Sequence, residues 1–428
     1  MKLAIAISVF VSAYALIATE WVHRVIVVLG GAALMFLFHI VDARDAFSSH
    51  EHGIDWNVIF LLFGMMVIVG VLRHTGLFEY LAIWSAKRSR GDPFRVMVLL
   101  LLITAGASAL LDNVTTLLLI APVTLLLTER LGVAPIPFLL AEVFASNIGG
   151  TATLVGDPPN IIIGSRAELS YLDFLVNLGP IVVILLAVFI LMAHRLFRGA
   201  LVPHPERIEE VMSLDEREAI EPGPLLPRAL AVLGVVTVAF ILQGILGYEP
   251  SVVALLGAGV LLLIAGEGHE RFLAEVEWHT LVFFIGLFIM VGALVKVGAI
   301  DSLAEQVIDL TDGNLLLATM LLLVVSAILS AIVDNIPYVA TMTPLVLALA
   351  ASIPGDTTVL WWALALGADL GGNATSIGAS ANVVVVGTAE RSGYRIRFGE
   401  FVRSGIPVTV VTVTISGLYL WLRYFVLA

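Results

Sequence analysis

The sequence predicts an all-α polytopic membrane protein. It is built from two inverted repeats, each of five transmembrane spans plus one re-entrant hairpin, with broken helices at the centre. Three observations carry this prediction: the composition, the length of the apolar segments and an internal repeat. Of the 428 residues, 60% are hydrophobic and 13% are charged, whereas a soluble domain is about half apolar and about a quarter charged. The chain contains no cysteine, which excludes disulfides, thiolate metal sites and cysteine nucleophiles.

Apolar segments long enough to cross a bilayer occur in both halves of the chain. The first follows a single lysine and has features of a signal peptide, but its counterpart in the second half favours a span. The segments predicted to span the membrane are 3–19, 24–41, 56–72, 136–164, 179–197, 228–247, 250–266, 278–295, 357–388 and 405–426.

Two further apolar stretches, 93–129 and 314–350, are interrupted near their midpoints by polar residues. Each piece is short for a span, so we predict re-entrant hairpins that enter and leave on one face. Non-helical backbone at that depth is tolerated only where protein or a water-filled cavity buries it. Both hairpins should therefore end inside the protein rather than in lipid.

An internal repeat relates the two halves at a constant offset of 222 residues. Shared apolar composition alone would not keep polar residues in one register. Because each repeat has an odd number of spans, the second is upside down relative to the first, and such repeats place the substrate site near mid-membrane. The aligned pairs include Gly64 with Gly286, Gly76 with Gly298, Ser108 with Ser330, Asp112 with Asp334, Asn113 with Asn335, Gly150 with Gly372, Thr153 with Thr375 and Asn160 with Asn382.

The repeat divides the chain into three parts. We predict an N-terminal repeat at 1–198, a cytoplasmic linker at 199–227 and a C-terminal repeat at 228–428. Most of the 22 Lys and Arg residues, Arg24 among them, are assigned to the face that carries the linker, and an excess of these residues marks cytoplasmic loops. Both termini are then expected outside. The first hairpin enters from the cytoplasm and the second from outside.

Aspartates interrupt the apolar segments. A carboxylate at the centre of a transmembrane helix costs about 2.5–3.5 kcal/mol on insertion scales, so it is a functional candidate. Asp112 and Asp334 also stand where an N-cap is expected, but a serine would cap without that cost. The residues expected to bind coupling protons or cations are Asp112, Asp157, Asp334, Asp369, Ser108 and Ser330.

Two glycine-rich segments should unwind the helices that contain them. The pairs 149–150 and 371–372 weaken a helix, and Pro158-Pro159 ends it. Glycines also permit tight helix packing, but the accompanying Thr, Ser and Asn residues favour a binding site. The residues predicted to surround the solute are Asn113, Thr151, Thr153, Asn160, Asn335, Asn373, Thr375, Ser376 and Asn382.

Other polar residues carry weaker signals. His39, His74 and His279 lie in or beside spans without a metal-ligand partner one turn away, so we expect no metal site and no cofactor. The apolar spans contain no Ser–His or His–Glu arrangement, which argues against an enzyme, and no basic stripe suggests nucleic acid. Lys296 follows a span and should reach the outer membrane interface.

Four segments around the candidate residues read LLDNVTTLLLIAPVTLLL, EVFASNIGGTATLVGDPPNIIIGS, VDNIPYVATMTP and LGADLGGNATSIGASANVVVVG. They closely resemble the ArsB/P-protein family of the ion-transporter superfamily and are nearest to its P-protein branch. The resemblance covers nearly the whole chain. It implies a secondary active transporter in the bacterial inner membrane that works by elevator-type alternating access, with homodimers as in related carriers. Whether an ATPase subunit docks on the cytoplasmic face is left open.

The resemblance leaves two substrate classes. Sodium-coupled dicarboxylate carriers of the superfamily have Ser-Asn-Thr at the hairpin tips, where this sequence reads Asp112-Asn113-Val114 and Asp334-Asn335-Ile336. A carboxylate at each tip would repel a dianion, so dicarboxylate transport is disfavoured. We expect proton-coupled efflux of neutral arsenite or antimonite, and the missing cysteines fit because thiolates would hold As(III) too firmly. The alternative is a Na⁺ (cation)/H⁺ antiporter, which buried aspartates and exposed carbonyls would also serve.

Overall fold

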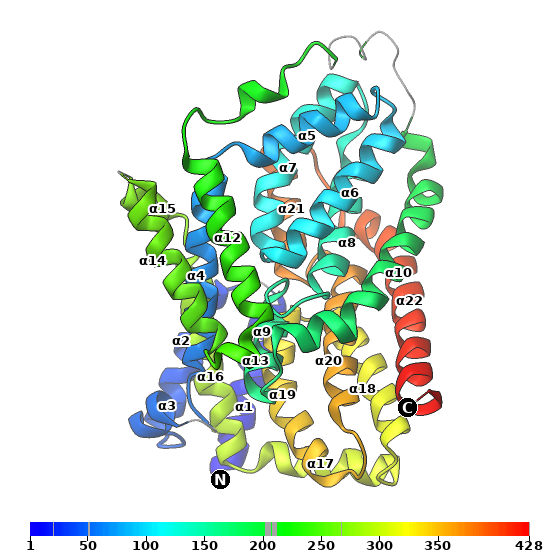
Figure 1. Ribbon diagram of the computed structural model, residues 1–428. Coiled ribbons are helices and arrows are strands. Elements are labelled where there is room, and N and C mark those ends of the chain that lie inside the picture. Colours follow the sequence, from blue (N-terminus) through cyan, green and yellow to red (C-terminus); the bar gives the residue numbers. More distant parts are fainter. Residues whose placement is uncertain (20, 50–51, 202–206, 208–211, 267, 428) are drawn as a thin grey trace.

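The helices of the protein follow the apolar segments of the sequence closely (Figure 1). The structure is a computed structural model and describes residues 1–427 apart from 20, 50–51, 202–206, 208–211 and 267. Within the described residues there are helices but no β-strand, which confirms the predicted all-α class. Residues 202–206 and 208–211 of the predicted linker lie outside the described residues.

The two halves contain the same order of helices. In the first half these are α1 (Lys2–Thr19), α2 (Arg24–Leu37), α3 (Ala43–Ser48), α4 (Trp56–Arg73), α5 (Leu77–Arg88), α6 (Pro93–Leu110), α7 (Asn113–Leu131), α8 (Pro135–Gly150), α9 (Pro158–Ala167) and α10 (Tyr171–Phe197). The short helices η1 (Arg198–Ala200) and η2 (Glu216–Ala219) follow. In the second half they are α12 (Leu225–Ile241), α13 (Gln243–Leu246), α14 (Pro250–Ala265), α15 (His269–Ala274), α16 (Trp278–Lys296), α17 (Ala299–Thr311), α18 (Leu315–Ser330), α19 (Asn335–Ser352), α20 (Thr358–Gly371), η3 (Gly372–Ala374), α21 (Ser380–Arg391), α22 (Phe398–Trp421) and η4 (Leu422–Val426).

Eight of the described helices are long and apolar enough to cross a membrane, or nine if the pair α17–α18, bent by 118°, is counted. The apolar helices α2, α12 and α14 are shorter. α2 packs on α16, and α14 packs on α4, each against a glycine of the longer helix. A Cβ added at Gly64 would lie 2.7 Å from the carbonyl carbon of Ala254, and one at Gly286 would lie 2.8 Å from Cγ2 of Val28. The same glycine position therefore packs, in each repeat, against the equivalent helix of the other repeat.

The second repeat is inverted relative to the first. Figure 1 shows α5 and α6 at one end of the molecule and their counterparts α17 and α18 at the other. α5 follows Gly76 (φ 72°) and α17 follows Gly298 (φ 74°), so a glycine in the left-handed region makes the bend in both repeats. We call the end with α5 and η2 the linker face, and the end with α17 and the start of α1 the terminus face.

Two predicted spans, 136–164 and 357–388, are broken in the middle. The chain is non-helical between α8 and α9, where Pro158 and Pro159 occupy the first positions of α9, and between η3 and α21. Near these breaks stand the hairpin tips, where α6 meets α7 and α18 meets α19. The predicted helix breaks and the paired helices of 93–129 and 314–350 are thus present at the predicted places. The arms α6, α7 and α19, predicted to be short for a span, are each long and apolar enough to cross a membrane.

Each hairpin packs tightly against the broken helix of its own repeat. A Cβ added at Gly149 would lie 2.3 Å from the carbonyl oxygen of Ala105, and one at Gly371 would lie 2.5 Å from that of Ala327. Ser108 donates a hydrogen bond to the Ser146 carbonyl (2.8 Å), and its counterpart Ser330 donates to the Ala368 carbonyl (2.6 Å). These contacts join α6 to α8 and α18 to α20, so each hairpin and its broken helix form one rigid unit, which we call a hairpin block.

Candidate functional site

The polar residues of both repeats converge on one carboxylate. Asn113 begins α7 and Asn335 begins α19, so each lies at a hairpin tip. The Asn113 Nδ2 donates to Asp157 Oδ2 at 2.6 Å, and the Asn335 Nδ2 lies 3.4 Å from both Asp157 oxygens. Asp157 is 1% exposed. Its counterpart in the second repeat is Ala379, so a pair of equivalent asparagines meets a single acid.

Asn147 extends this contact into a network across the repeats. Its Oδ1 accepts from Asn113 Nδ2 at 3.2 Å. Its Nδ2 donates to Asn373 Oδ1 (2.9 Å) and to Asn382 Oδ1 (3.1 Å), both in the second repeat. The sequence reasoning missed Asn147, although the 222-residue register aligns it with Asp369 and could have found it.

Asp369 is the second acid of the centre and differs from Asp157 in its surroundings. It lies in α20 and is fully buried, and neither carboxylate oxygen has a hydrogen-bond partner among the described residues. Thr151 and Asn160 lie beside it. Both direct their donors to backbone carbonyls instead: Thr151 to that of Asn147 (2.8 Å) and Asn160 to that of Thr153 (3.0 Å). A buried carboxylate without partners is costly, so the site is built to receive a proton, a cation or a donor group.

The unpaired atoms of the centre are mostly acceptors. Besides the two Asp369 oxygens, the Oδ1 atoms of Asn113 and Asn160 have no hydrogen-bond partner within the described part of the chain. One donor, Asn373 Nδ2, is also unpaired there. Buried oxygens in this number call for a ligand that donates hydrogen bonds or carries positive charge.

The two tip aspartates lie at the edge of this centre. Asp112 caps α7 and accepts from the Thr115 N–H (2.7 Å) and hydroxyl (2.5 Å). Asp334 caps α19, accepts from the Ile336 N–H (3.1 Å) and also accepts from the Ser380 hydroxyl. Capping, which the sequence suggested, therefore occurs at both tips.

Arg24, which the sequence groups with the arginines of the cytoplasmic face, reaches the second hairpin tip. Its guanidinium Nη1 lies 3.5 Å from Asp334 Oδ2 and donates to Ser380 Oγ at 2.7 Å. Tyr14 in α1 reaches the same hairpin and bonds to the Pro337 carbonyl and to Thr341. The N-terminal helices α1 and α2 thus hold the second tip. The corresponding residues for the first tip, Val236 and Leu246, offer no polar group.

Several predicted solute ligands instead brace the unwound chain. Thr153 donates to the Ala109 carbonyl (2.5 Å) and Thr375 to the equivalent Ala331 carbonyl (2.6 Å). Asn382 donates to the carbonyls of Gly372 and Thr375, both at 2.8 Å, as Asn160 does in the first repeat. Ser376 lies in the half-buried turn after η3. Two residues of the predicted set, Asn113 and Asn335, bond to Asp157. Two others, Asn373 and Asn382, accept hydrogen bonds from Asn147.

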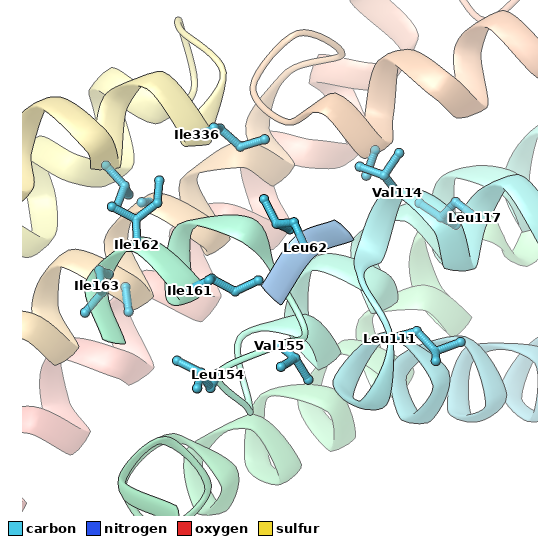
Figure 2. Close-up of a cluster of buried hydrophobic side chains, with 14 of the residues drawn as sticks. Leu62, Leu111, Val114, Leu117, Leu154, Val155, Ile161, Ile162, Ile163 and Ile336 are labelled. Carbon is cyan, nitrogen blue, oxygen red and sulfur yellow. The ribbon is translucent and has the colours of Figure 1, made fainter. Parts of the chain in front are cut away.

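An apolar layer separates the polar centre from α4. Figure 2 shows Val114 and Ile336, which follow the two tip asparagines, on either side of Leu62, with Ile161 of α9 nearby. All four side chains are less than 10% exposed.

Two crevices lie between the hairpin blocks and the helices α4 and α16. The crevice on the terminus face has a volume of about 1140 Å³, and Asp55, Ile161, Arg166, Phe288 and Ala340 are among its lining residues. The crevice on the linker side has about 20 Å³ and is lined by Met66, Val69, Gly70, Arg73, Thr115, Leu118, Leu119, Glu275 and Glu277. The large crevice ends at the apolar layer. Of these two crevices, the one on the terminus side is therefore much the larger.

The chemistry of the site fits solute binding. In the part of the chain that the structure describes, no three His, Asp or Glu side chains are grouped as metal ligands. Glu142, a further buried acid in α8, accepts from the Thr124 hydroxyl at 2.6 Å. The features present are amides, carboxylates and unwound backbone between two rigid blocks.

Comparison with known proteins identifies the family. The model of the CitMHS citrate transporter family matches residues 14–367. The chain belongs to this family. A Mycobacterium tuberculosis protein named as an uncharacterized transporter is 56% identical to it, with 99% of each chain covered, and the 46 kDa membrane protein of Mycobacterium leprae shows the same identity and coverage.

The P protein is a more distant relative. Human P protein is 34% identical over 99% of this chain, which covers 60% of its length. The predicted similarity to the P-protein branch is therefore confirmed, while the family model that matches is that of the citrate transporters. The crystal structure of the Alcanivorax borkumensis YdaH transporter has a TM-score of 0.54, with 14% identity and 85% of each chain covered. The protein is thus a polytopic membrane transporter with the predicted fold class.

Proposed function

We propose that this transporter is proton-coupled and that its centre takes a small, uncharged solute rich in hydroxyl groups, with arsenite or antimonite as the candidate. The observation that carries the proposal is the set of unpaired buried oxygens on Asn113, Asn160 and Asp369. Trihydroxy-arsenic is neutral and offers three O–H donors. Such donors match a site whose free groups are mostly acceptors.

Charge argues against a free carboxylate substrate at this centre. The family name refers to citrate, but a citrate anion would meet Asp157 and Asp369 at the centre and an aspartate at each hairpin tip. Arg24 is a positive group beside one of these acids, but it is already paired with Asp334. At close range like charges repel strongly in a poorly solvated site. A neutral or cationic solute avoids this repulsion.

Asp157 and Asp369 are the proposed sites of the coupling proton. Both lie on broken helices, one from each repeat. In the proposed cycle a proton and the solute occupy the centre in turn, which produces exchange. The hairpin blocks then move against α4 and α16, so that one crevice closes as the other opens.

A Na⁺/H⁺ antiporter is the second candidate. It is favoured by Asp369, whose two oxygens are both unpaired, together with the free Oδ1 of the adjacent Asn160. Oxygen ligands and a carboxylate suit a hard cation. The same acids would then bind Na⁺ and protons competitively.

We propose the bacterial inner membrane as the location, with both termini outside and the linker face in the cytoplasm. The arginines of α5 and the loop after it support this orientation. We also propose a homodimer, because a hairpin block that moves across the membrane needs other helices that stay fixed in it. Docking of an ATPase subunit on the linker face is left as a question for co-purification.

The decisive experiment is transport into reconstituted vesicles. Uptake of arsenite, antimonite, Na⁺ and citrate is measured with and without a pH gradient, for the wild type and for Asp157→Asn. We expect arsenite transport that follows the pH gradient and is lost in the variant. Gradient-driven Na⁺ transport without arsenite transport would select the antiporter. Citrate transport with neither of the other two would contradict both proposals.

A further inference from the structure

The linker-side crevice contains an acid that the proposed site does not use. Glu277 precedes the first residue of α16. Its Oε2 accepts from the Thr280 hydroxyl at 2.9 Å, while its Oε1 is buried and has no hydrogen-bond partner within the described residues. An unpaired oxygen of this kind is open to a water molecule or a proton.

The crevice around Glu277 is lined by residues from the linker side and by one residue of a hairpin tip. Arg73 and Glu275, which form an ion pair, are among them. Its inner wall includes Thr115, whose N–H and hydroxyl both bond to Asp112. A polar cavity needs roughly 10–15 Å³ to hold a water molecule, so a volume of about 20 Å³ has room for one.

The equivalent acid on the terminus side is arranged differently. Asp55 occupies the position of Glu277 in the first repeat. Its Oδ2 lies 3.2 Å from Arg166 Nε and accepts from the Ser165 hydroxyl at 2.8 Å, while Oδ1 accepts from the Val58 N–H. Arg166 has Thr388 as its counterpart, so the second repeat lacks the arginine that would pair with Glu277. The terminus-side acid is neutralised, and the linker-side acid is not.

We propose that Glu277 is the proton-exchange residue of the linker side. It takes a proton from water in the crevice and delivers it, through a water molecule beside Thr115, to the carboxylate of Asp112. In the reverse direction it returns the proton to the crevice. No other bond is made or broken. This inference rests on the proposed proton coupling.

The charged groups that face Glu277 come from several elements. Asp112 at the first tip and Arg24 in α2 are close enough to interact with it electrostatically. Glu275 and Arg73 line the same crevice. The Nε2 atom of His74 lies 3.2 Å from Oε1 of Glu275. Glu277 thus stands between solvent at the linker face and the acid of the moving tip.

The test separates proton exchange from solute movement in reconstituted vesicles. The variants are Glu277→Gln, Glu277→Asp and, as a control, Glu270→Gln in exposed α15. The probe is arsenite, or Na⁺ if the wild type carries Na⁺ instead. Two rates are measured: net transport driven by a pH gradient, and exchange of labelled for unlabelled probe, which needs no net proton movement.

We expect Glu277→Gln to lower net transport about 100-fold, the lower range for loss of a positioned proton-transfer group. Probe exchange should stay near the wild-type rate, Glu277→Asp should restore net transport in part, and Glu270→Gln should match the wild type. Wild-type net transport and pH profile in Glu277→Gln would overturn the inference, and so would an equal loss of both rates. Wild-type transport that ignores the pH gradient would instead refute the proposed coupling itself.

Discussion

The two crevices are lined by corresponding residues yet differ greatly in volume. Met66, Val69, Gly70 and Leu118 line the linker-side crevice of about 20 Å³. Their counterparts Phe288, Val291, Gly292 and Ala340 line the terminus-side crevice of about 1140 Å³. Equivalent positions of the two repeats therefore line a small crevice on the linker side and a large one on the terminus side.

Each crevice is lined by residues of a hairpin and of α4 or α16. Inverted repeats have two equivalent packings, and one of them is present here. Since Gly149 and Ala105, like Gly371 and Ala327, are in backbone contact, each hairpin must travel with its broken helix. The following predictions test this comparison, from the largest expected effect to the smallest.

The centre between the crevices depends on Asp157. Replacing it in Asp157→Asn removes the charge on which Asn113 and Asn335 converge. Hydrogen bonds to a charged group contribute about 1.5–3 kcal/mol, so we expect solute transport to fall about 100-fold. Transport in vesicles measures the effect, with Asp309→Asn on exposed α17 as the control. Transport within twofold of the wild type would remove Asp157 from the mechanism.

The rigid contact within the first hairpin block depends on Gly149. A Cβ in Gly149→Ala would meet the Ala105 carbonyl oxygen at 2.3 Å. Overpacking of this kind costs about 1–3 kcal/mol, and we expect lower thermal stability in detergent. Gly106→Ala, with nothing within 4 Å of the added carbon, is the matched control and should be neutral or stabilising. Equal stability of both variants would mean that the block is loosely packed.

The state of the crevices can be read by labelling. The chain has no cysteine, so Val69→Cys and its counterpart Val291→Cys report each crevice separately. We expect a thiol reagent to reach Cys at 291 quickly and Cys at 69 slowly. Cysteines at 88, 217 and 427 determine which face is cytoplasmic. Equal rates at 69 and 291 would show that the protein does not rest in one state.

The smallest effect is expected at the ion pair between Lys296 and Asp45. Lys296, expected from sequence at the membrane interface, pairs with Asp45 of α3. The hydrogen bond from Lys296 lowers the pKa of the Asp45 carboxyl. A lowered pKa adds stability above the unfolded value of about 3.9, and this stability is lost as pH falls through the lower folded value.

We therefore expect Lys296→Met to reduce the free energy of unfolding by about 0–1 kcal/mol at pH 7, as for other exposed pairs. The difference from the wild type should shrink as pH falls below about 4, where the unfolded state takes up the proton, and vanish below the lower folded pKa of Asp45. Unfolding in detergent at the two pH values measures it. A difference that persists in acid would mean that Lys296 acts through packing.

Most of the architecture could be predicted from the sequence because it depends on local and periodic signals. Apolar length defined the spans, and Gly149-Gly150 with Pro158-Pro159 located a break. The register of the repeat then placed the tip asparagines together. These signals lie within short segments, so they can be recognised in the sequence without knowing how the helices pack.

The parts that the sequence did not reveal depend on contacts between distant segments. Arg24 meets Asp334 across more than half of the chain, and no spacing rule connects them. The hydroxyls of Thr153 and Thr375 were predicted to face the solute, but in this state they bond to carbonyls of the hairpins. The relative position of the two crevices is a property of one conformation, which composition does not encode.

Asn147 and Asp369 occupy the same position in the two copies of the repeat. If the halves were separate identical chains, the position would hold two amides or two acids. Two amides would leave the centre without this charge, and two buried acids would repel each other. Joining the copies in one polypeptide allowed one position to keep an amide that bridges the repeats and the other to keep a free carboxylate. A single polypeptide thus permits two different roles at one repeated position, which a symmetric dimer of identical half-length chains cannot have.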